Sequence, residues 1–172
     1  MKLRPTGLGV RGAVFFCTVV LLFFATPYSN LFFLLTAFLS ALSVQAVSGC
    51  RRNLRGVTAE LRSLHAAAAG SGHDVEILLH AGNRTRFGLR MLVHTASGKH
   101  LIETPAIVRG EVLVRGRIGG LPRGVHEVQT LRVQSMHPFG MCRGEVACAV
   151  QADVVAYPAP ATLRAGRDPW AG

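Results

Sequence analysis

The strongest constraint on this chain is a long stretch without charge. No Asp, Glu, Lys or Arg occurs between Gly12 and Cys50, and most residues there are apolar. A helix rises 1.5 Å per residue, so about 20 apolar residues cross the hydrocarbon layer of a bilayer. The stretch is nearly twice that length, and turn-forming residues interrupt it at 26–30. The sequence therefore predicts a transmembrane helical hairpin with helices over about 8–25 and 31–49.

Positive residues flank both ends of this hairpin. Three precede the first helix and three follow the second: Lys2, Arg4, Arg11, Arg51, Arg52 and Arg55. Positive flanks are retained in the cytoplasm, so we expect a multi-pass protein of the cytoplasmic membrane with both termini inside. A cleavable signal peptide has one short apolar core, whereas this apolar region continues through a second segment.

A lipoprotein signal is the alternative interpretation of the same region. Val47–Cys50 resembles the bacterial lipobox, in which a cysteine after small residues is lipidated. This interpretation predicts an envelope-facing lipoprotein or ligand-binding sandwich lipidated at Cys50, with Cys142 joined to Cys148. The position of Cys50, behind two hydrophobic segments and before paired arginines, argues against it. No C-x-x-C pair accompanies the four cysteines, so the spacing does not indicate a zinc site.

After the hairpin the hydrophobic pattern becomes alternating, which is the period of half-buried strands. Glycine-bearing turns separate short segments of this kind, and no intervening stretch has helical length except the short His65–Ala69. We therefore expect an all-β, immunoglobulin-like sandwich over 51–160 and a flexible tail over 161–172. The expected strands are Val57–Leu64, Val75–His80, Phe87–Thr95, Leu101–Val108, Val112–Ile118, Val125–Gln134 and Ala149–Ala156.

The formal net charge of +10 favours anionic partners. The arginines are dispersed and lack interleaved aromatic residues, a combination that disfavours nucleic-acid binding and leaves membrane lipid as the expected anionic partner.

The sequence carries no pattern typical of catalysis. The seven histidines show no H-x-x-x-H or H-E-x-x-H arrangement, and no P-loop, dinucleotide fingerprint or G-x-S-x-G elbow occurs. The acidic residues fall mostly in alternating strand patterns, which is typical of a solvated face. We expect neither an enzyme nor a bound cofactor or metal.

Several short blocks resemble the bacterial domain of unknown function 58 family. They follow the hairpin in the family's order and at about its spacing: Arg51–Gly56, Phe87–Arg90, Pro122–His126, Ser135–Met141 and Val155–Pro160. The resemblance implies a bacterial inner-membrane protein that works with a MoxR-type AAA+ ATPase or another membrane protein. The arginine-rich and tryptophan-containing blocks that end the family's pattern do not occur in this sequence.

The resemblance also nominates candidate residues for structure or partner docking. These are Arg52, Asn53, Leu54, Arg55, Gly56, Arg123, Gly124, His126, Pro138, Phe139, Gly140, Tyr157 and Pro158. Pro138–Gly140 is typical of a tight turn, with Phe139 expected to plug the sandwich edge, and Arg123–Gly124 is expected in a turn before a strand. For these two blocks the residue types favour a structural role over binding. The sequence as a whole predicts a membrane-anchored interaction module.

Overall fold

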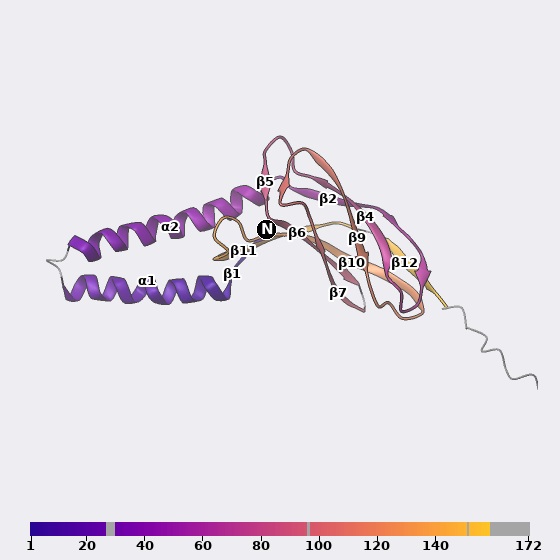
Figure 1. Ribbon diagram of the computed structural model, residues 1–172, viewed down its shortest axis with the longest axis horizontal. Helices are drawn as coiled ribbons and strands as arrows, with labels where there is room; N and C mark the ends of the chain where they lie inside the picture. The colour runs from indigo at the N-terminus through magenta and orange to yellow at the C-terminus, as the bar shows by residue number, and fades with distance from the viewer. Residues whose placement is uncertain (27–29, 96, 151, 159–172) are drawn as a thin grey trace, which may run out of the picture.

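The computed structural model describes residues 1–26, 30–95, 97–150 and 152–158, and shows a helical hairpin followed by a β-sandwich (Figure 1). The predicted tail over 161–172 lies outside the described residues. The elements are β1 (Lys2–Pro5), α1 (Gly7–Ala25), α2 (Asn30–Leu54), β2 (Thr58–Leu64), β3 (Ala67–Ala68), β4 (His73–His80), β5 (Arg86–Phe87), β6 (Leu89–Thr95), β7 (Gly98–Glu103), β8 (Ile107–Val108), β9 (Glu111–Ile118), β10 (Gly124–Ser135), β11 (Cys142–Cys148) and β12 (Asp153–Tyr157).

Helices α1 and α2 lie side by side and project from one end of the β-domain (Figure 1). Both are long and apolar enough to cross a membrane, and only 6% of the apolar window of each is buried. Thr6 caps the N-terminus of helix α1, and its hydroxyl accepts a hydrogen bond from the backbone N–H of Gly9 at 3.1 Å. Helix α2 continues to Leu54, five residues beyond the predicted end at 49, because its last turn packs into the β-domain.

The smaller sheet of the sandwich has the order β2-β4-β9, with antiparallel pairing throughout. Along β4 the inward residues are fully buried and their neighbours partly or wholly exposed, as the alternating sequence predicts. The inward apolar residues of β4 are Val75, Ile77 and Leu79.

The larger sheet is built around the twelve-residue strand β10. Strand β6 pairs along one side of β10 and carries β7 on its outer edge. The other side is divided, since β12 pairs with Gly124–Glu127 and β11 with Leu131–Ser135. Strand β1 completes the sheet beyond β11, and β3 beyond β12.

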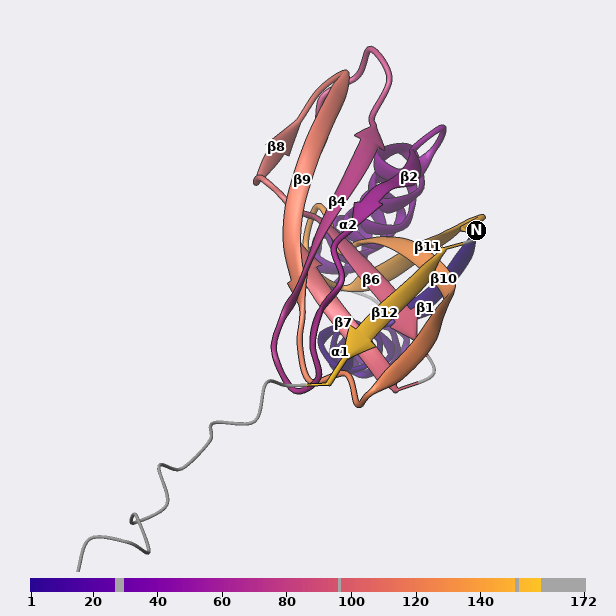
Figure 2. The same cartoon turned by 90° about the vertical axis from the view of Figure 1, so that its right-hand side faces the viewer.

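The two sheets pack face to face around one hydrophobic core, and Figure 2 shows the β2-β4-β9 sheet lying across the larger one. The larger sheet contributes Leu89, Met91, Val93, Leu131 and Val133, all at most 2% exposed. The predicted class, a helical hairpin followed by an all-β sandwich, is thus confirmed.

Three strands were not predicted from the sequence. Strand β1 was interpreted only as a charged flank of the hairpin, yet it pairs in register with β11, Leu3 lying opposite Gly144. Strand β3 occupies part of the short helical candidate, which instead pairs in parallel with β12. Strand β11 falls in a segment with weak alternation. Three expected strands also differ: 87–95 is broken at Gly88 between β5 and β6, 101–108 is broken between β7 and β8, and β12 begins at Asp153.

Candidate functional site

The end of α2 is fastened to the β-domain by Asn53. Its amide nitrogen donates to the carbonyl oxygen of Phe87 at 2.8 Å and to the hydroxyl of Ser135 at 2.7 Å. Its amide oxygen accepts from the backbone N–H of Phe87 at 3.0 Å. The Asn53 side chain is buried, so these bonds satisfy polar groups that have little water around them.

Arg86 closes the C-terminal end of the same helix. Its guanidinium donates to the backbone carbonyls of Arg52, Arg55 (2.7 Å) and Ala81 (3.2 Å). Carbonyls at a helix end have no partner within the helix, and the helix dipole makes this end negative, so a buried cation complements it. Burial, with Arg84 as a smaller cause, lowers the pKa of Arg86. The predicted Arg52–Gly56 block therefore attaches the helix through the Asn53 side chain and through the backbone carbonyls of Arg52 and Arg55, while its arginine side chains remain exposed.

A loop over residues 136–141 contacts both helices. A Cβ atom built on Gly9 would lie 2.0 Å from the carbonyl oxygen of Met141, and one built on Gly49 would lie 2.8 Å from Pro138 Cδ. The absence of side chains at these two positions lets the loop approach α1 and α2. The Thr6 hydroxyl also donates to the carbonyl of Gly140 at 2.6 Å.

This loop contains the predicted Pro138–Gly140 turn. The His137–Pro138 peptide bond is cis, and Gly140 has a φ of +68°, as the prediction of a glycine turn requires. The expectation for Phe139 is wrong: its side chain is 44% exposed and does not plug the sandwich edge. The ring of Phe87, which is 39% exposed, stacks on His137 of this loop with ring centroids 5.0 Å apart.

The structure divides the candidate residues into two groups. Arg52–Gly56 and Pro138–Gly140 meet at the hairpin end of the β-domain, in the contacts described above. The remaining five lie where β10 begins and β12 ends, at the far end from the hairpin: Arg123, Gly124, His126, Tyr157 and Pro158.

The five residues at the far end are held in place by backbone pairing between β10 and β12. Gly124 lies opposite Ala156 in the register of β10 and β12. His126 is buried, and its Nε2 lies 2.7 Å from the carbonyl oxygen of Pro122, so this histidine has a structural partner within the fold. The thirteen residues therefore do not form one site.

A cluster of cations that sequence reasoning missed lies on the outer surface of the larger sheet. We call it the basic face, and it consists of Arg4, Arg90, Lys99, Arg132 and Arg143, which surround a hollow of ≈ 380 Å³. They come from β1, β6, β7, β10 and β11, so no short stretch of sequence contains two of them. Arg4 lies directly opposite Arg143 in the sheet register, an arrangement of like charges that destabilises a strand pair.

One acidic residue also lines this hollow. Glu145 accepts from Arg132 at 3.4 Å and from the Gln134 amide at 3.1 Å. Two buried nitrogen atoms of the hollow have no hydrogen-bond partner among the described residues: His94 Nε2 and Arg132 Nε. Burial, followed by the charges of Arg132 and Lys99, lowers the pKa of His94. An acceptor group placed in the hollow would meet excess positive charge.

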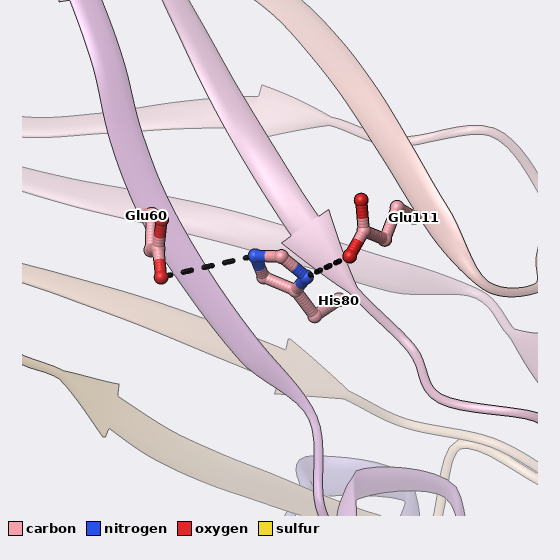
Figure 3. A network of polar contacts seen from close by, with 3 residues as sticks. All are labelled: Glu60, His80 and Glu111. Atoms are coloured by element: carbon pink, nitrogen blue, oxygen red, sulfur yellow. Dashed lines mark hydrogen bonds and ion pairs between the residues drawn. The ribbon is translucent and has the colours of Figure 1, made fainter.

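The outer surface of the smaller sheet has mixed charge. His80 lies between two glutamates, with Nδ1 3.1 Å from Glu111 and Nε2 3.8 Å from Glu60 (Figure 3). Both glutamate side chains are more than half exposed, at 63% and 69%. On the same surface Arg115 pairs with Glu76 at 2.9 Å. These groups compensate one another on an open sheet, so the surface lacks the charge excess of the basic face.

The cysteines do not support the disulfide that the lipoprotein alternative requires. Cys142 and Cys148 stand at opposite ends of β11, and strand geometry separates them by about 20 Å, whereas a disulfide needs Cα atoms within about 7 Å. All four cysteines are free thiols. In the ranges that the structure describes, no group of three His, Cys, Asp or Glu side chains has the arrangement of a metal site.

Comparison with known proteins leaves the chain without a family. No protein-family model matches it, and neither does any curated protein. The resemblance to the domain of unknown function 58 family therefore rests on its short blocks. Among solved structures, a CARDB domain from Pyrococcus furiosus, crystallised in complex with di-metal ions, matches 58% of this chain and 93% of its own length. With 8% identity and a TM-score of 0.29, that match carries no inference about function.

Proposed function

We propose that this protein is a membrane-anchored, non-enzymatic interaction module whose β-domain docks an acidic surface of a cytoplasmic protein. The observation that supports the docking is the basic face, where, among the described residues, five cations surround one hollow and one carboxylate offsets them. Charge complementarity of this kind speeds association and selects partners.

The anchor in this proposal is the helical hairpin. Apolar side chains along both helices face outward, among them Leu21, Phe24, Leu31 and Phe33, each at least 60% exposed. Such a surface is unfavourable in water and suits lipid. The cations before α1 and at the end of α2 favour a cytoplasmic β-domain in a bacterial inner membrane.

The structural junction supports a fixed position of the basic face relative to the bilayer. Arg4 lies in β1, three residues before the start of α1, and Arg143 lies opposite it. Because β1 is part of the sheet and Asn53 fastens α2 to β5, both helices connect to the domain without a flexible linker. A partner docked on the basic face would be held beside the membrane surface.

The family resemblance nominates a MoxR-type AAA+ ATPase as the first partner to test. Nucleic acid, another anionic class, fits the basic face less well, because the aromatic side chains on which bases stack are absent among the residues that line it.

The envelope-facing lipoprotein is the second candidate. Lipidation at Cys50 would require this residue to become the first of the mature chain. Cys50 is fully buried within α2, and cleavage before it would separate α2 from the turn that carries Asn53. This packing favours the anchored module over the lipoprotein.

The compartment is tested by cysteine labelling in intact cells and spheroplasts. We expect Cys142 to react with a membrane-permeant maleimide and to be protected from an impermeant one. Labelling of Cys142 by the impermeant reagent in intact spheroplasts would place the β-domain outside and support the envelope alternative.

Docking is tested by capturing a purified MoxR-type ATPase with the detergent-solubilised protein. The variant Arg90→Glu/Arg143→Glu reverses two exposed charges of the basic face, and Arg62→Glu/Arg109→Glu makes the same charge change at exposed positions outside it. We expect capture at low salt by the wild type and the control, and a loss of at least tenfold for the basic-face variant. Equal capture by both variants, or none by the wild type, would contradict the proposed docking.

A further inference from the structure

A second basic groove lies at the end of α2, where the chain leaves the proposed bilayer. It has a volume of ≈ 580 Å³, and Arg51, Arg52 and Arg55 line it. The first two of these arginines directly follow the uncharged stretch of α2. In Figure 1 the N-terminus, β1 and β11 lie beside this end of the helix. In the proposed bilayer this end of the helix would lie in the lipid headgroup region.

The rest of the groove is apolar. Leu54 and Val57 are buried beneath it, and the partly buried Leu3 and Val146 form its side toward the sheet. Among the residues that the structure describes, no acidic one lines the groove. A ligand that fits this surface carries a negative group joined to an apolar part. A free phosphate ion would leave the apolar side of the groove without a partner.

The C-terminal end of a helix ordinarily repels anions, because its free carbonyl groups carry partial negative charge. Here the Arg86 guanidinium occupies the carbonyls of Arg52 and Arg55 from the protein side. The groove therefore keeps the positive charge of its three arginines without opposition from the helix end.

We propose that this groove binds the headgroup of one anionic phospholipid, its phosphate paired with the arginines and its glycerol and first methylene groups against Leu3 and Val146. Arginine forms two parallel hydrogen bonds with a phosphate, so it suits this role better than lysine. The proposal rests on the membrane anchoring in the proposed function and adds a specific lipid site to it.

The test is native mass spectrometry of the full-length protein in detergent, titrated with phosphatidylglycerol or phosphatidylcholine. We expect one phosphatidylglycerol molecule to bind more tightly than phosphatidylcholine. Each juxtamembrane arginine contributes roughly a fivefold change in affinity, so Arg51→Gln/Arg55→Gln should weaken phosphatidylglycerol binding roughly 25-fold. The matched control is Arg62→Gln/Arg109→Gln, which removes the same charge at exposed positions outside both the groove and the basic face and should bind phosphatidylglycerol as the wild type does.

Four results would overturn the lipid site. The first three are equal binding of both lipids to the wild type, an unchanged preference in Arg51→Gln/Arg55→Gln, and an equal loss in the control, which would show an effect of overall charge. Displacement of the lipid by millimolar inorganic phosphate would also contradict the proposal, because it would identify a phosphate site without a lipid component. Failure of the proposed membrane anchoring can be distinguished from failure of the lipid site. It would appear as release of the protein from membranes by alkaline carbonate.

Discussion

Asn53 and Phe87 exchange two hydrogen bonds, one from the Asn53 amide to the Phe87 carbonyl at 2.8 Å and one from the Phe87 N–H to the Asn53 carbonyl oxygen at 3.0 Å. The side chain of a helical residue thus pairs with the backbone of β5 in the way that a neighbouring strand would. Through this pair the hairpin and the sandwich share a continuous hydrogen-bonded structure, and the position of the β-domain is set by α2.

Replacing Asn53 should weaken the β-domain as well as the junction. Asn53→Ala leaves the N–H and carbonyl of Phe87 and the hydroxyl of Ser135 without their partner, and we expect the free energy of unfolding to fall by about 3 kcal/mol. A urea titration in mild detergent, followed by circular dichroism, measures it. Arg51→Ala, which removes an exposed side chain on the same helical turn, should change stability little; equal losses would refute a specific role of Asn53.

The contact between α1 and the 136–141 loop can be tested at two glycines. A Cβ at Gly9 would lie 2.0 Å from the Met141 carbonyl oxygen, whereas one at Gly7 meets nothing within 4 Å. We expect Gly9→Ala to destabilise the protein by about 2 kcal/mol through overpacking, while Gly7→Ala is neutral or slightly stabilising. Thermal unfolding of both variants in the same detergent makes the comparison. A Gly9→Ala protein as stable as Gly7→Ala would show that the loop does not hold α1 in this position.

Mild acid should destabilise the β-domain through two histidines. Burial lowers the pKa of His94 and of His100, and for His94 the charges of Arg132 and Lys99 act in the same direction. The unfolded chain therefore binds protons before the folded one does, and stability falls as the pH drops below the ordinary histidine value of 6.5. Urea titrations between about pH 7 and pH 5 should show a smaller loss in His94→Gln/His100→Gln than in the wild type. The control is His65→Gln, which replaces an exposed histidine. If the double variant loses as much stability in acid as this control does, the assignment of the pH dependence to His94 and His100 is contradicted.

Cys148 should be a poorly reactive thiol. Burial raises its pKa, and a hydrogen bond with the backbone of Ala59 offsets only part of this effect. Since the thiolate is the reactive form, maleimide labelling of Cys148 at pH 7 should be at least tenfold slower in the folded protein than in urea. Peptide mapping after a short labelling pulse measures the rate at Cys148. Equal rates in the two states would mean that β11 does not bury this side chain.

The sequence alone determined the elements whose signal is local. The uncharged stretch is long enough to cross a membrane twice and has turn formers in its middle. A helical hairpin is the fold that suits it, because the core of one small domain could not bury so many apolar residues. The alternation of apolar and polar residues along β4 and β9 likewise indicated half-buried strands, because successive side chains of a strand point to opposite faces of the sheet.

Tertiary structure decided what depends on pairing between distant segments. Four residues such as Lys2–Pro5 carry too little pattern to indicate a strand, and only the register with β11 makes them one. The basic face follows from the same cause. Its five cations are dispersed over the chain, and hydrogen bonding between strands brings them to one surface. Cys142 and Cys148, close in sequence, are kept apart because an extended strand lies between them. Local physics specifies the helices and the strongly alternating strands, whereas strand order and register, set by long-range packing, add the short pairing strands and specify which side chains meet.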